Sequence, residues 1–134
     1  MNVVHAALPF LKSSANSQLI LCGSVAGYRG WPSGQPYCAS KAALINYAES
    51  LRVELPEIDV KLISPGFVKT RLTDKNDFKM PFIISPEDAA KAIVKGMKSN
   101  CFEIHFPKIF TYIMKFLRIL PAWIYIPLTR LAKK

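Results

Sequence analysis

The chain has 134 residues, of which 51% are hydrophobic and 20% are charged. These values fit a single globular domain and exclude a chain that is disordered over most of its length. Lys and Arg number 18 against 9 Asp and Glu, which gives a net charge of +9. Nucleic acid, an anionic membrane and a phosphorylated ligand are therefore candidate partners, although a basic surface also serves solubility alone.

Three widely spaced cysteines, Cys22, Cys38 and Cys101, include no C-x-x-C pair. This spacing argues against a disulfide framework or a zinc ribbon, and we expect reduced, mostly buried thiols in a cytoplasmic protein. His5 and His105 lack metal-ligand spacing, so no metal site is predicted. The sequence shows no secretory signal pattern and no run of about 20 uncharged apolar residues, so no ordinary transmembrane helix is predicted.

The first third of the chain contains a helix, a strand and a loop in that order. Residues 2–11 have the pattern of the tail of an amphipathic helix that ends near Pro9, and a polar turn follows at 13–17. Residues 18–23 are a short apolar run bounded by turn signals, which is typical of a strand buried on both faces of a parallel sheet. The glycines and prolines of residues 24–36 predict a loop.

A second helix and a second strand follow. From Tyr37 to about Leu55 the apolar residues recur with the spacing of one helix face, and Pro56 ends the helix. Residues 59–64 predict a strand that closes in a Pro-Gly pair. The mixed, charged segment 67–85 predicts a loop with room for a short helix.

A third helix and strand complete the pattern. Ser85 is a suitable N-cap, and Pro86 with the two acids after it favours a helix that reaches about Lys98. Residues 101–106 predict the third strand. Strands that alternate with helices in this way indicate an α/β fold with a parallel sheet, in which both crossovers should be right-handed.

The pair formed by Tyr37 and Lys41 is the first candidate for chemistry. A spacing of four places both side chains on one face of the helix. An ammonium beside a phenol stabilises the phenolate, which a general acid and base needs near neutral pH. The residues between them are small and let a flat ligand approach. Taken alone, such a pair is more often an ordinary feature of a helix surface.

The ends of the two preceding strands give that pair a context. Ser24 directly follows the first predicted strand, and ligands of open α/β sheets bind outside the carboxyl ends of the strands. A hydroxyl there can donate to a substrate oxygen whose charge changes during a reaction. The second strand ends in Pro65-Gly66, where glycine allows close backbone approach, and Thr70 offers a hydroxyl near a phosphate or an amide.

Three motifs in register make this sequence similar to the short-chain dehydrogenase/reductase family over about residues 1–106. They are Gly23-Ser24-Val25-Ala26-Gly27, Tyr37-Cys38-Ala39-Ser40-Lys41-Ala42-Ala43 and Pro65-Gly66-Phe67-Val68-Lys69-Thr70. The resemblance implies the C-terminal part of a Rossmann-like doubly wound parallel sheet, with three strands, flanking helices and a helical C-terminal tail. It also implies an NAD(P)-dependent oxidoreductase that acts on a small carbonyl or alcohol and often forms homo-oligomers.

The resemblance assigns a role to each matching residue. Ser24 would orient and polarise the substrate oxygen, Tyr37 would pass the proton, and Lys41 would support the phenolate and hold the nicotinamide ribose. Tyr37 and Lys41 therefore also count as cofactor-binding residues. The remaining residues implied to line the cofactor are Pro65 and Gly66 beside the nicotinamide, the backbone of Val68 at its carboxamide, and Thr70 near the phosphates.

The family's dinucleotide-binding half does not match any part of this sequence. Gly23, Gly27 and Gly30 do not form G-x-G, and the prolines after them forbid a helix start. The Asn-Ala-Gly strand end and the catalytic asparagine are also missing. We therefore expect residues 1–106 to be the catalytic half of a longer enzyme, inactive alone, with an apolar open edge on its first strand. The choice between NAD and NADP cannot be read from these residues.

Residues 107–134 form a basic, amphipathic extension rich in aromatic residues and broken by Pro121 and Pro127. It fits peripheral contact with an anionic membrane, or a helical pair that covers the substrate pocket or a subunit contact. Nucleic acid is not expected, because no base-reading motif accompanies the charge.

Two alternatives remain open at this stage. The chain is the catalytic half of an oxidoreductase, or it is a non-enzymatic membrane- or protein-interaction module that retains the family scaffold. A group of apolar residues near the variable substrate loop fits either an apolar substrate or plain core packing: Phe67, Phe78, Met80 and Phe82.

Overall fold

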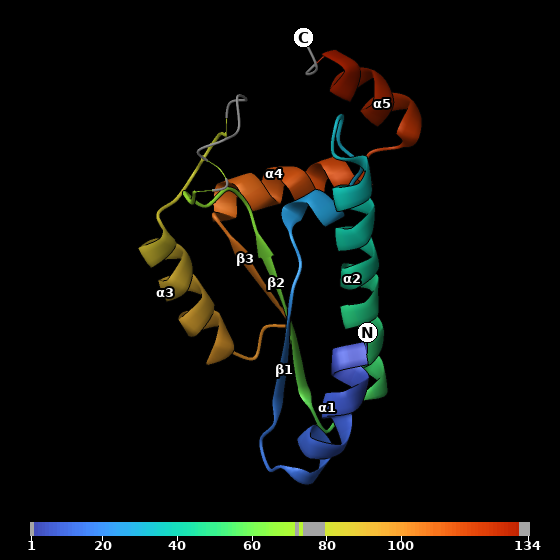
Figure 1. The fold of residues 1–134 in the computed structure, drawn as a ribbon. Helices are drawn as coiled ribbons and strands as arrows, with labels where there is room; N and C mark the ends of the chain where they lie inside the picture. Colours follow the sequence, from blue (N-terminus) through green and yellow to red (C-terminus); the bar gives the residue numbers. More distant parts are fainter. Residues whose placement is uncertain (1, 72, 74–79, 132–134) are drawn as a thin grey trace.

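The computed structural model of the chain describes residues 2–71, 73 and 80–131. Phe78, Lys133 and Lys134 lie outside these residues. The elements follow one another as helices and strands around one sheet (Figure 1). In chain order they are α1 (Asn2–Ser13), β1 (Gln18–Cys22), the 3-10 turn η1 (Val25–Gly27), α2 (Gln35–Glu54), β2 (Asp59–Pro65), α3 (Pro86–Met97), β3 (Glu103–Phe106), α4 (Lys108–Ile119) and α5 (Ala122–Leu131).

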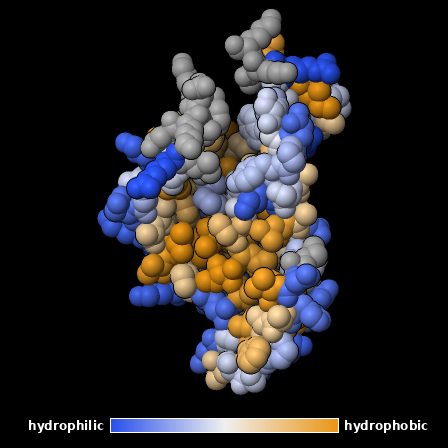
Figure 2. All heavy atoms as spheres, viewed as in Figure 1, coloured by the Kyte–Doolittle hydropathy of each residue, from blue (hydrophilic) through white to orange (hydrophobic). Residues whose placement is uncertain are grey.

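The three strands form a parallel sheet in the order β1-β2-β3, which confirms the predicted α/β fold. Leu21 pairs with Leu62, and Ile63 with Ile104, so the carboxyl ends of all three strands meet at one edge. Among the described residues, β1 has a strand neighbour on one side only. Apolar side chains gather on the face around β1 in Figure 2, as expected for an open edge.

The helices α2 and α3 cover opposite faces of the sheet (Figure 1). Leu62 of β2 packs with the α2 side chains in one apolar cluster, whereas its neighbour Ile63 packs with Ala89 of α3 in another. Because the strand order continues in one direction, helices on opposite faces require crossovers of opposite hand. The prediction that both crossovers are right-handed is therefore wrong for one of them. A long connection precedes α3 and gives the chain room to change face.

The structure tests the predicted start of one helix and the predicted effect of two prolines. Ser85 caps α3 as predicted, since its Oγ accepts from the amide of Asp88 at 3.1 Å. Pro9 does not end the first helix but lies inside α1, which continues to Ser13. Pro127 likewise lies inside α5. Both helices contact the rest of the chain along only one side, so the loss of one backbone hydrogen bond is tolerated.

The three cysteines are free, and the described residues offer neither a metal site nor a membrane-spanning helix. All three cysteines are free, but only Cys38 is buried, so the expectation of mostly buried thiols is wrong. Among the described residues, no group of three His, Cys, Asp or Glu side chains is placed to hold a metal ion. None of the helices described is both long and apolar enough to cross a bilayer.

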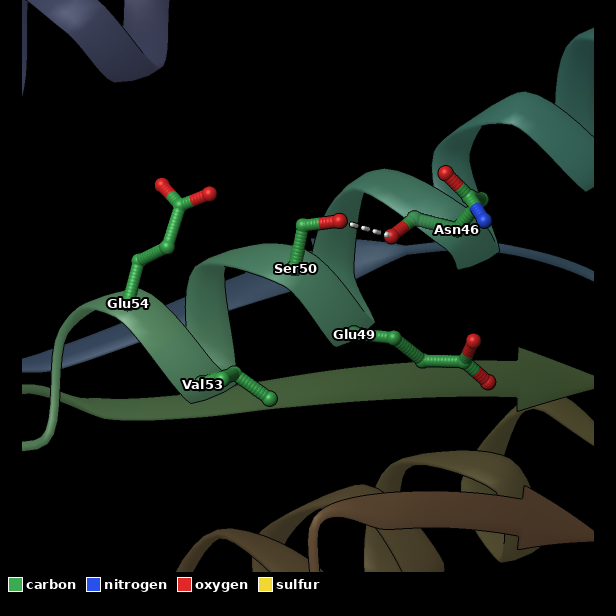
Figure 3. A pocket seen from close by; sticks show the side chains of 5 residues that line it. All are labelled: Asn46, Glu49, Ser50, Val53 and Glu54. Carbon is green, nitrogen blue, oxygen red and sulfur yellow. Dashed lines mark hydrogen bonds between the residues drawn. The ribbon is translucent and has the colours of Figure 1, made fainter.

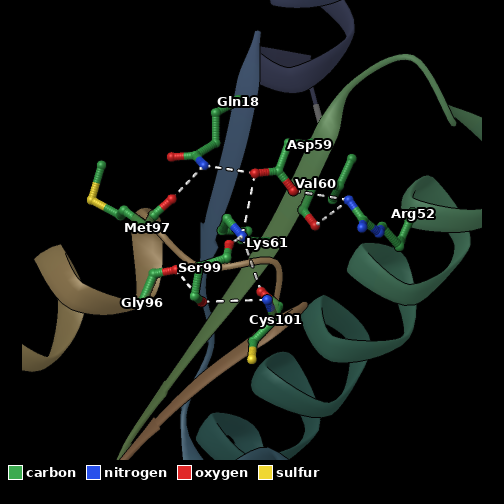
Figure 4. Close-up of polar contacts among 9 residues, drawn as sticks. All are labelled: Gln18, Arg52, Asp59, Val60, Lys61, Gly96, Met97, Ser99 and Cys101. Atoms are coloured by element: carbon green, nitrogen blue, oxygen red, sulfur yellow. Dashed lines mark hydrogen bonds and ion pairs between the residues drawn. The ribbon is translucent and has the colours of Figure 1, made fainter. Parts of the chain in front are cut away.

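A buried lysine anchors the amino ends of the strands (Figure 4). Lys61 has no exposed surface, and its Nζ donates to the carbonyls of Ser99 at 2.5 Å and Cys101 at 3.1 Å. Asp59 lies 3.3 Å from the same Nζ and also accepts from Arg52 and Gln18. Burial opposes the charged carboxylate of Asp59, but these donors outweigh it and lower its pKa.

A second polar cluster lies under α4, on the face of the sheet that α2 covers. Glu103 of β3 accepts hydrogen bonds from Tyr28, from Ser64 at 2.6 Å and from Lys115 of α4 at 2.6 Å. Burial alone would raise the pKa of Glu103, but the three donors outweigh it and hold the pKa below its usual range. Burial and the bond to Glu103 raise the pKa of Tyr28. These bonds fix α4 on β3.

His105 is held neutral beside this cluster. The hydroxyl of Thr111 donates to the carbonyl of Lys108, so its oxygen accepts from His105 Nδ1 at 2.6 Å. His105 Nε2 then accepts from the ammonium of Lys108 at 3.2 Å. Burial, followed by the charges of Lys115 and Lys108, lowers the pKa of His105 from 6.5 to about 4.

The lowered pKa of His105 predicts a pH-dependent stability. As the pH falls below 6.5, the unfolded chain binds a proton on His105 that the folded chain does not bind until about pH 4. Stability should therefore fall on acidification, with a slope of at most one proton, about 1.4 kcal/mol per pH unit.

Urea unfolding between about pH 6.5 and pH 5 measures this slope, because carboxylates titrate mainly below that window. The variant His105→Gln should flatten the slope, whereas His5→Gln, at an exposed position of α1, should leave it unchanged. An unchanged slope in His105→Gln would contradict the assignment.

Candidate active site

Ser24 lies at the carboxyl end of β1 and begins the loop that we call the serine loop, residues 24–31. The amide of Gly23 donates to the carbonyl of Ile63 at 2.7 Å and extends the strand pairing to this point. Ser24 is buried and extended, and its Oγ caps η1 by accepting from the amide of Ala26 at 3.2 Å. Since Oγ is the acceptor in that bond, its own proton is left to donate to a ligand.

Tyr37 and Lys41 reach the same edge of the sheet from α2. The ammonium of Lys41 donates to the carbonyl of Cys22, the last residue of β1, at 2.9 Å. The same nitrogen lies 5.7 Å from the ring centre of Tyr37, which is 52% exposed. The bond to Cys22 thus holds the ammonium of Lys41 at the strand end from which Ser24 follows, and the ring of Tyr37 lies near that ammonium.

Gly27 brings the serine loop against the backbone of α2. A Cβ atom on Gly27 would lie 2.7 Å from the carbonyl carbon and oxygen of Lys41, and 2.7 Å from Cδ1 of Ile45. A side chain at this position would therefore push the loop away from the helix. The missing side chain of Gly27 keeps Ser24 and Lys41 on adjoining segments at a short separation.

The Pro65-Gly66 turn lies at the same edge, but the side of Gly66 that lacks a side chain faces α4. The amide of Gly66 donates to the carbonyl of Phe106 at 2.7 Å. A Cβ on Gly66 would lie 2.7 Å from Cδ1 of Phe110. The close approach predicted from the glycine is therefore made, on this side, by an aromatic ring of the chain itself.

Val68 and Thr70 lie on the segment that leaves this edge. Val68 forms a parallel bridge with Ile84, and its carbonyl accepts from the hydroxyl of Thr73 at 3.1 Å. The amide of Thr70 donates to the Thr73 hydroxyl at 2.7 Å, and the Thr70 hydroxyl accepts from the Thr73 amide at 3.3 Å. The polar groups of Thr70 and Thr73 are therefore engaged in a local turn.

Arg29 is a residue whose role the sequence did not reveal. Its guanidinium donates to the carbonyls of Arg118 at 2.8 Å and Leu120 at 3.0 Å, at the carboxyl end of α4. It also lies 4.4 Å from the ring centre of Tyr125 in α5, whose hydroxyl donates to the carbonyl of Gly30 at 2.6 Å. We call this set of contacts the Arg29 clasp. It ties the serine loop to both C-terminal helices, and no short-range pattern in the sequence signals it.

Two surface hollows of the described residues are not lined by Ser24, Tyr37 or Lys41. One runs between the serine loop and the first half of α2 and is lined by Gly27, Tyr28, Arg29, Gly30, Trp31, Gln35, Cys38, Ala39 and Ala42. The other lies on α2 itself, where Ser50 donates to the carbonyl of Asn46 at 3.1 Å, and is lined by Asn46, Glu49, Ser50, Val53 and Glu54 (Figure 3). About 14 Å of helix separates Asn46 from Tyr37, so this second hollow is not part of the candidate site.

Comparison with known proteins gives a family match and several relatives. The family described as short chain dehydrogenase matches residues 1–80. An uncharacterized oxidoreductase of Myxococcus xanthus is 40% identical over 106 residues, which are 78% of this chain and 42% of that protein. The 11-beta-hydroxysteroid dehydrogenase-like 4A of Arabidopsis thaliana is 39% identical over 101 residues, 69% of this chain and 33% of that protein. The chain thus spans less than half the length of these two relatives.

A relative of similar extent and a solved structure complete the comparison. The short-chain dehydrogenase/reductase homolog YusR of Bacillus subtilis is 37% identical over 99 residues, 66% of this chain and 77% of that protein. A short chain dehydrogenase from Burkholderia cenocepacia, solved in complex with NADP, superposes with a TM-score of 0.76 at 26% identity. That superposition covers 88% of this chain and 50% of the other chain.

The packing of Gly27 predicts the effect of a single methyl group. The variant Gly27→Ala should lower the free energy of unfolding by about 1–3 kcal/mol, because the new Cβ meets the backbone of Lys41, which cannot turn aside. Gly30→Ala in the same loop is the control, since a Cβ there meets nothing within 4 Å, and its change should stay within about 0.5 kcal/mol. Equal losses in the two variants, measured by urea unfolding, would refute the close approach.

Proposed function

This chain belongs to the short-chain dehydrogenase family, and on that premise we propose that it carries the proton-transfer half of an NAD(P)-dependent oxidoreductase. The reaction is the interconversion of a carbonyl and an alcohol. The observation that supports the proposal is the bond from Lys41 to Cys22, which brings the helix that carries Tyr37 and Lys41 to the strand end that Ser24 directly follows. A tyrosine and a lysine that were only neighbours on a helix surface would not need to bond to a strand. Lys41, in contrast, donates to the carbonyl of Cys22 in β1.

Each side chain has a defined part in the reaction. In the reductive direction, the hydroxyl of Ser24 donates to the carbonyl oxygen of the substrate and polarises it. Tyr37 gives its hydroxyl proton to that oxygen as the alcohol forms, and the ammonium of Lys41 stabilises the phenolate that remains. In the oxidative direction the same phenolate takes the proton back.

The donor set also suits a nicotinamide cofactor. When bound, the cofactor supplies or accepts the hydride, which is chemistry that no protein side chain provides. The ammonium of Lys41 and the half-exposed hydroxyl of Tyr37 suit the ribose hydroxyls. By the family pattern, Pro65, Gly66 and Val68 would lie beside the nicotinamide and Thr70 near the phosphates.

The pyrophosphate of the cofactor needs a different site. A glycine-rich turn at a helix N-terminus normally provides it, and no glycine of the described residues has a positive φ. We propose that binding of the whole dinucleotide requires residues other than these, and that the 134-residue chain alone turns over no substrate. The substrate is a small carbonyl or alcohol whose identity the site does not define, and a homo-oligomer remains the family expectation.

The role of Tyr37 predicts the effect of removing one hydroxyl. In the longest reading frame that contains these residues, Tyr37→Phe should lower turnover about 10²-fold or more, because the phenyl ring has no proton to give. The measurement is oxidation of NADH or NADPH against a panel of carbonyl compounds. Tyr47→Phe, at another tyrosine of α2, is the control and should keep its activity. Unchanged turnover in Tyr37→Phe, with an unchanged melting temperature, would refute the role.

Another prediction concerns the 134-residue chain by itself. Isothermal titration of the 134-residue chain with NADPH or NADH should give no binding in the micromolar range, because the family's pyrophosphate-binding turn is not among its residues. Micromolar affinity of this chain would contradict the proposed division of the site. It would leave the role of Tyr37 to be judged by the turnover experiment.

A further inference from the structure

The helix α4 has an apolar stripe on each of two sides. Phe110 and Met114 face inward and belong to the main core. A second stripe is exposed, and its members repeat at intervals of three or four residues, which places them on one side of the helix: Ile109, Tyr112, Ile113, Phe116 and Ile119. A surface helix that packs against one core needs only the first stripe.

The helix α5, which follows α4 along the chain, also exposes apolar side chains. Tyr125 and Thr129 are its buried residues. The exposed apolar residues of α5 are Trp123, Ile124, Ile126, Leu128 and Leu131. We use the name tail surface for these residues of α5 together with the outer stripe of α4. Two adjacent helices that expose so many large apolar side chains indicate that a partner covers them.

The tail surface has a fixed position on the domain. The Arg29 clasp holds the end of α4 and the ring of Tyr125 to the serine loop. Lys115 and Glu103 hold the middle of α4 to β3. The exposed stripe is therefore not the free side of a loosely attached helix that could turn inward to hide it.

The net charge of the chain from Ile104 onward indicates the class of partner. The sequence from Ile104 to Lys134 contains no Asp or Glu, and its basic residues are Lys108, Lys115, Arg118, Arg130, Lys133 and Lys134. Among the described residues, only Lys115 of this group forms an ion pair with an acid. A second copy of the same surface would bring these positive charges together, whereas an anionic surface would complement them.

We propose that the tail surface docks on the surface of a bilayer that contains anionic phospholipid. The helices α4 and α5 would lie in the plane of the interface, with their exposed apolar side chains among the acyl chains and those basic side chains that pair with no acid at the headgroups. Tyr112 and Trp123 suit this depth, because each has an apolar ring and a polar group. The docking does not depend on the proposed reaction.

Vesicle flotation tests the docking with the full chain. The chain should float with vesicles made of equal parts phosphatidylcholine and phosphatidylglycerol, but not with phosphatidylcholine alone, and raised salt should weaken the binding. The double variant Phe116→Ser/Trp123→Ser should bind at least about tenfold more weakly, because two side chains no longer leave water.

The control variant is Phe10→Ser, which removes an aromatic side chain from α1. Phe10 is 74% exposed, against 60% for Phe116 and 76% for Trp123, so none of the three substitutions opens the core. Phe10→Ser should bind anionic vesicles as the unchanged chain does. Equal weakening in the control and the double variant, or no binding of the unchanged chain to anionic vesicles, would overturn the proposal.

Tryptophan fluorescence gives a second readout that does not depend on variants of the docking residues. The chain has 2 tryptophans, and Trp31→Phe leaves Trp123 as the reporter. Anionic vesicles should shift the emission of Trp123 to shorter wavelength and protect it from iodide. Emission that is unchanged by vesicles but shifts with protein concentration would instead show that a second copy covers the surface, and would refute membrane docking.

Discussion

The contact between the serine loop and α2 is the constraint on which the candidate site depends. It exists because Gly27 has no side chain to separate the loop from the backbone of Lys41. The helix in turn reaches back to β1 through the bond from Lys41 to Cys22. Ser24, Tyr37 and Lys41 therefore keep their places through backbone packing and one charged hydrogen bond, without needing direct contact with one another.

The same short loop also carries the C-terminal helices. Tyr28 donates to Glu103, Arg29 holds the end of α4, and the carbonyl of Gly30 accepts from Tyr125. Any displacement of α4 or α5 must therefore be transmitted to, or absorbed by, residues that follow Ser24 directly. Docking of the tail surface and positioning of the candidate site thus share a physical connection through the Arg29 clasp.

The sequence was sufficient where a feature depends on neighbouring residues. The three strands, the capped start of α3 and the pairing of Tyr37 with Lys41 all follow from periodicity or short spacing. It was insufficient where a feature depends on contacts between distant segments. The face on which α3 packs, the clasp of Arg29 and the neutral state of His105 are set by partners that only the folded chain brings close. Pro9 misled the prediction because an exposed helix tolerates a missing bond.

The aromatic residues near the substrate loop show how a tertiary contact changes an interpretation. Phe67 and Phe82 could line an apolar substrate site or belong to the core. Their rings stack on Phe110 at centre distances of 5.4 Å and 6.2 Å, over the bare side of Gly66. Both rings therefore pack against α4, and Phe82 remains 47% exposed. The glycine that opens this space serves the attachment of the tail, so the end of β2 contributes both to the candidate site and to the support of the docking surface.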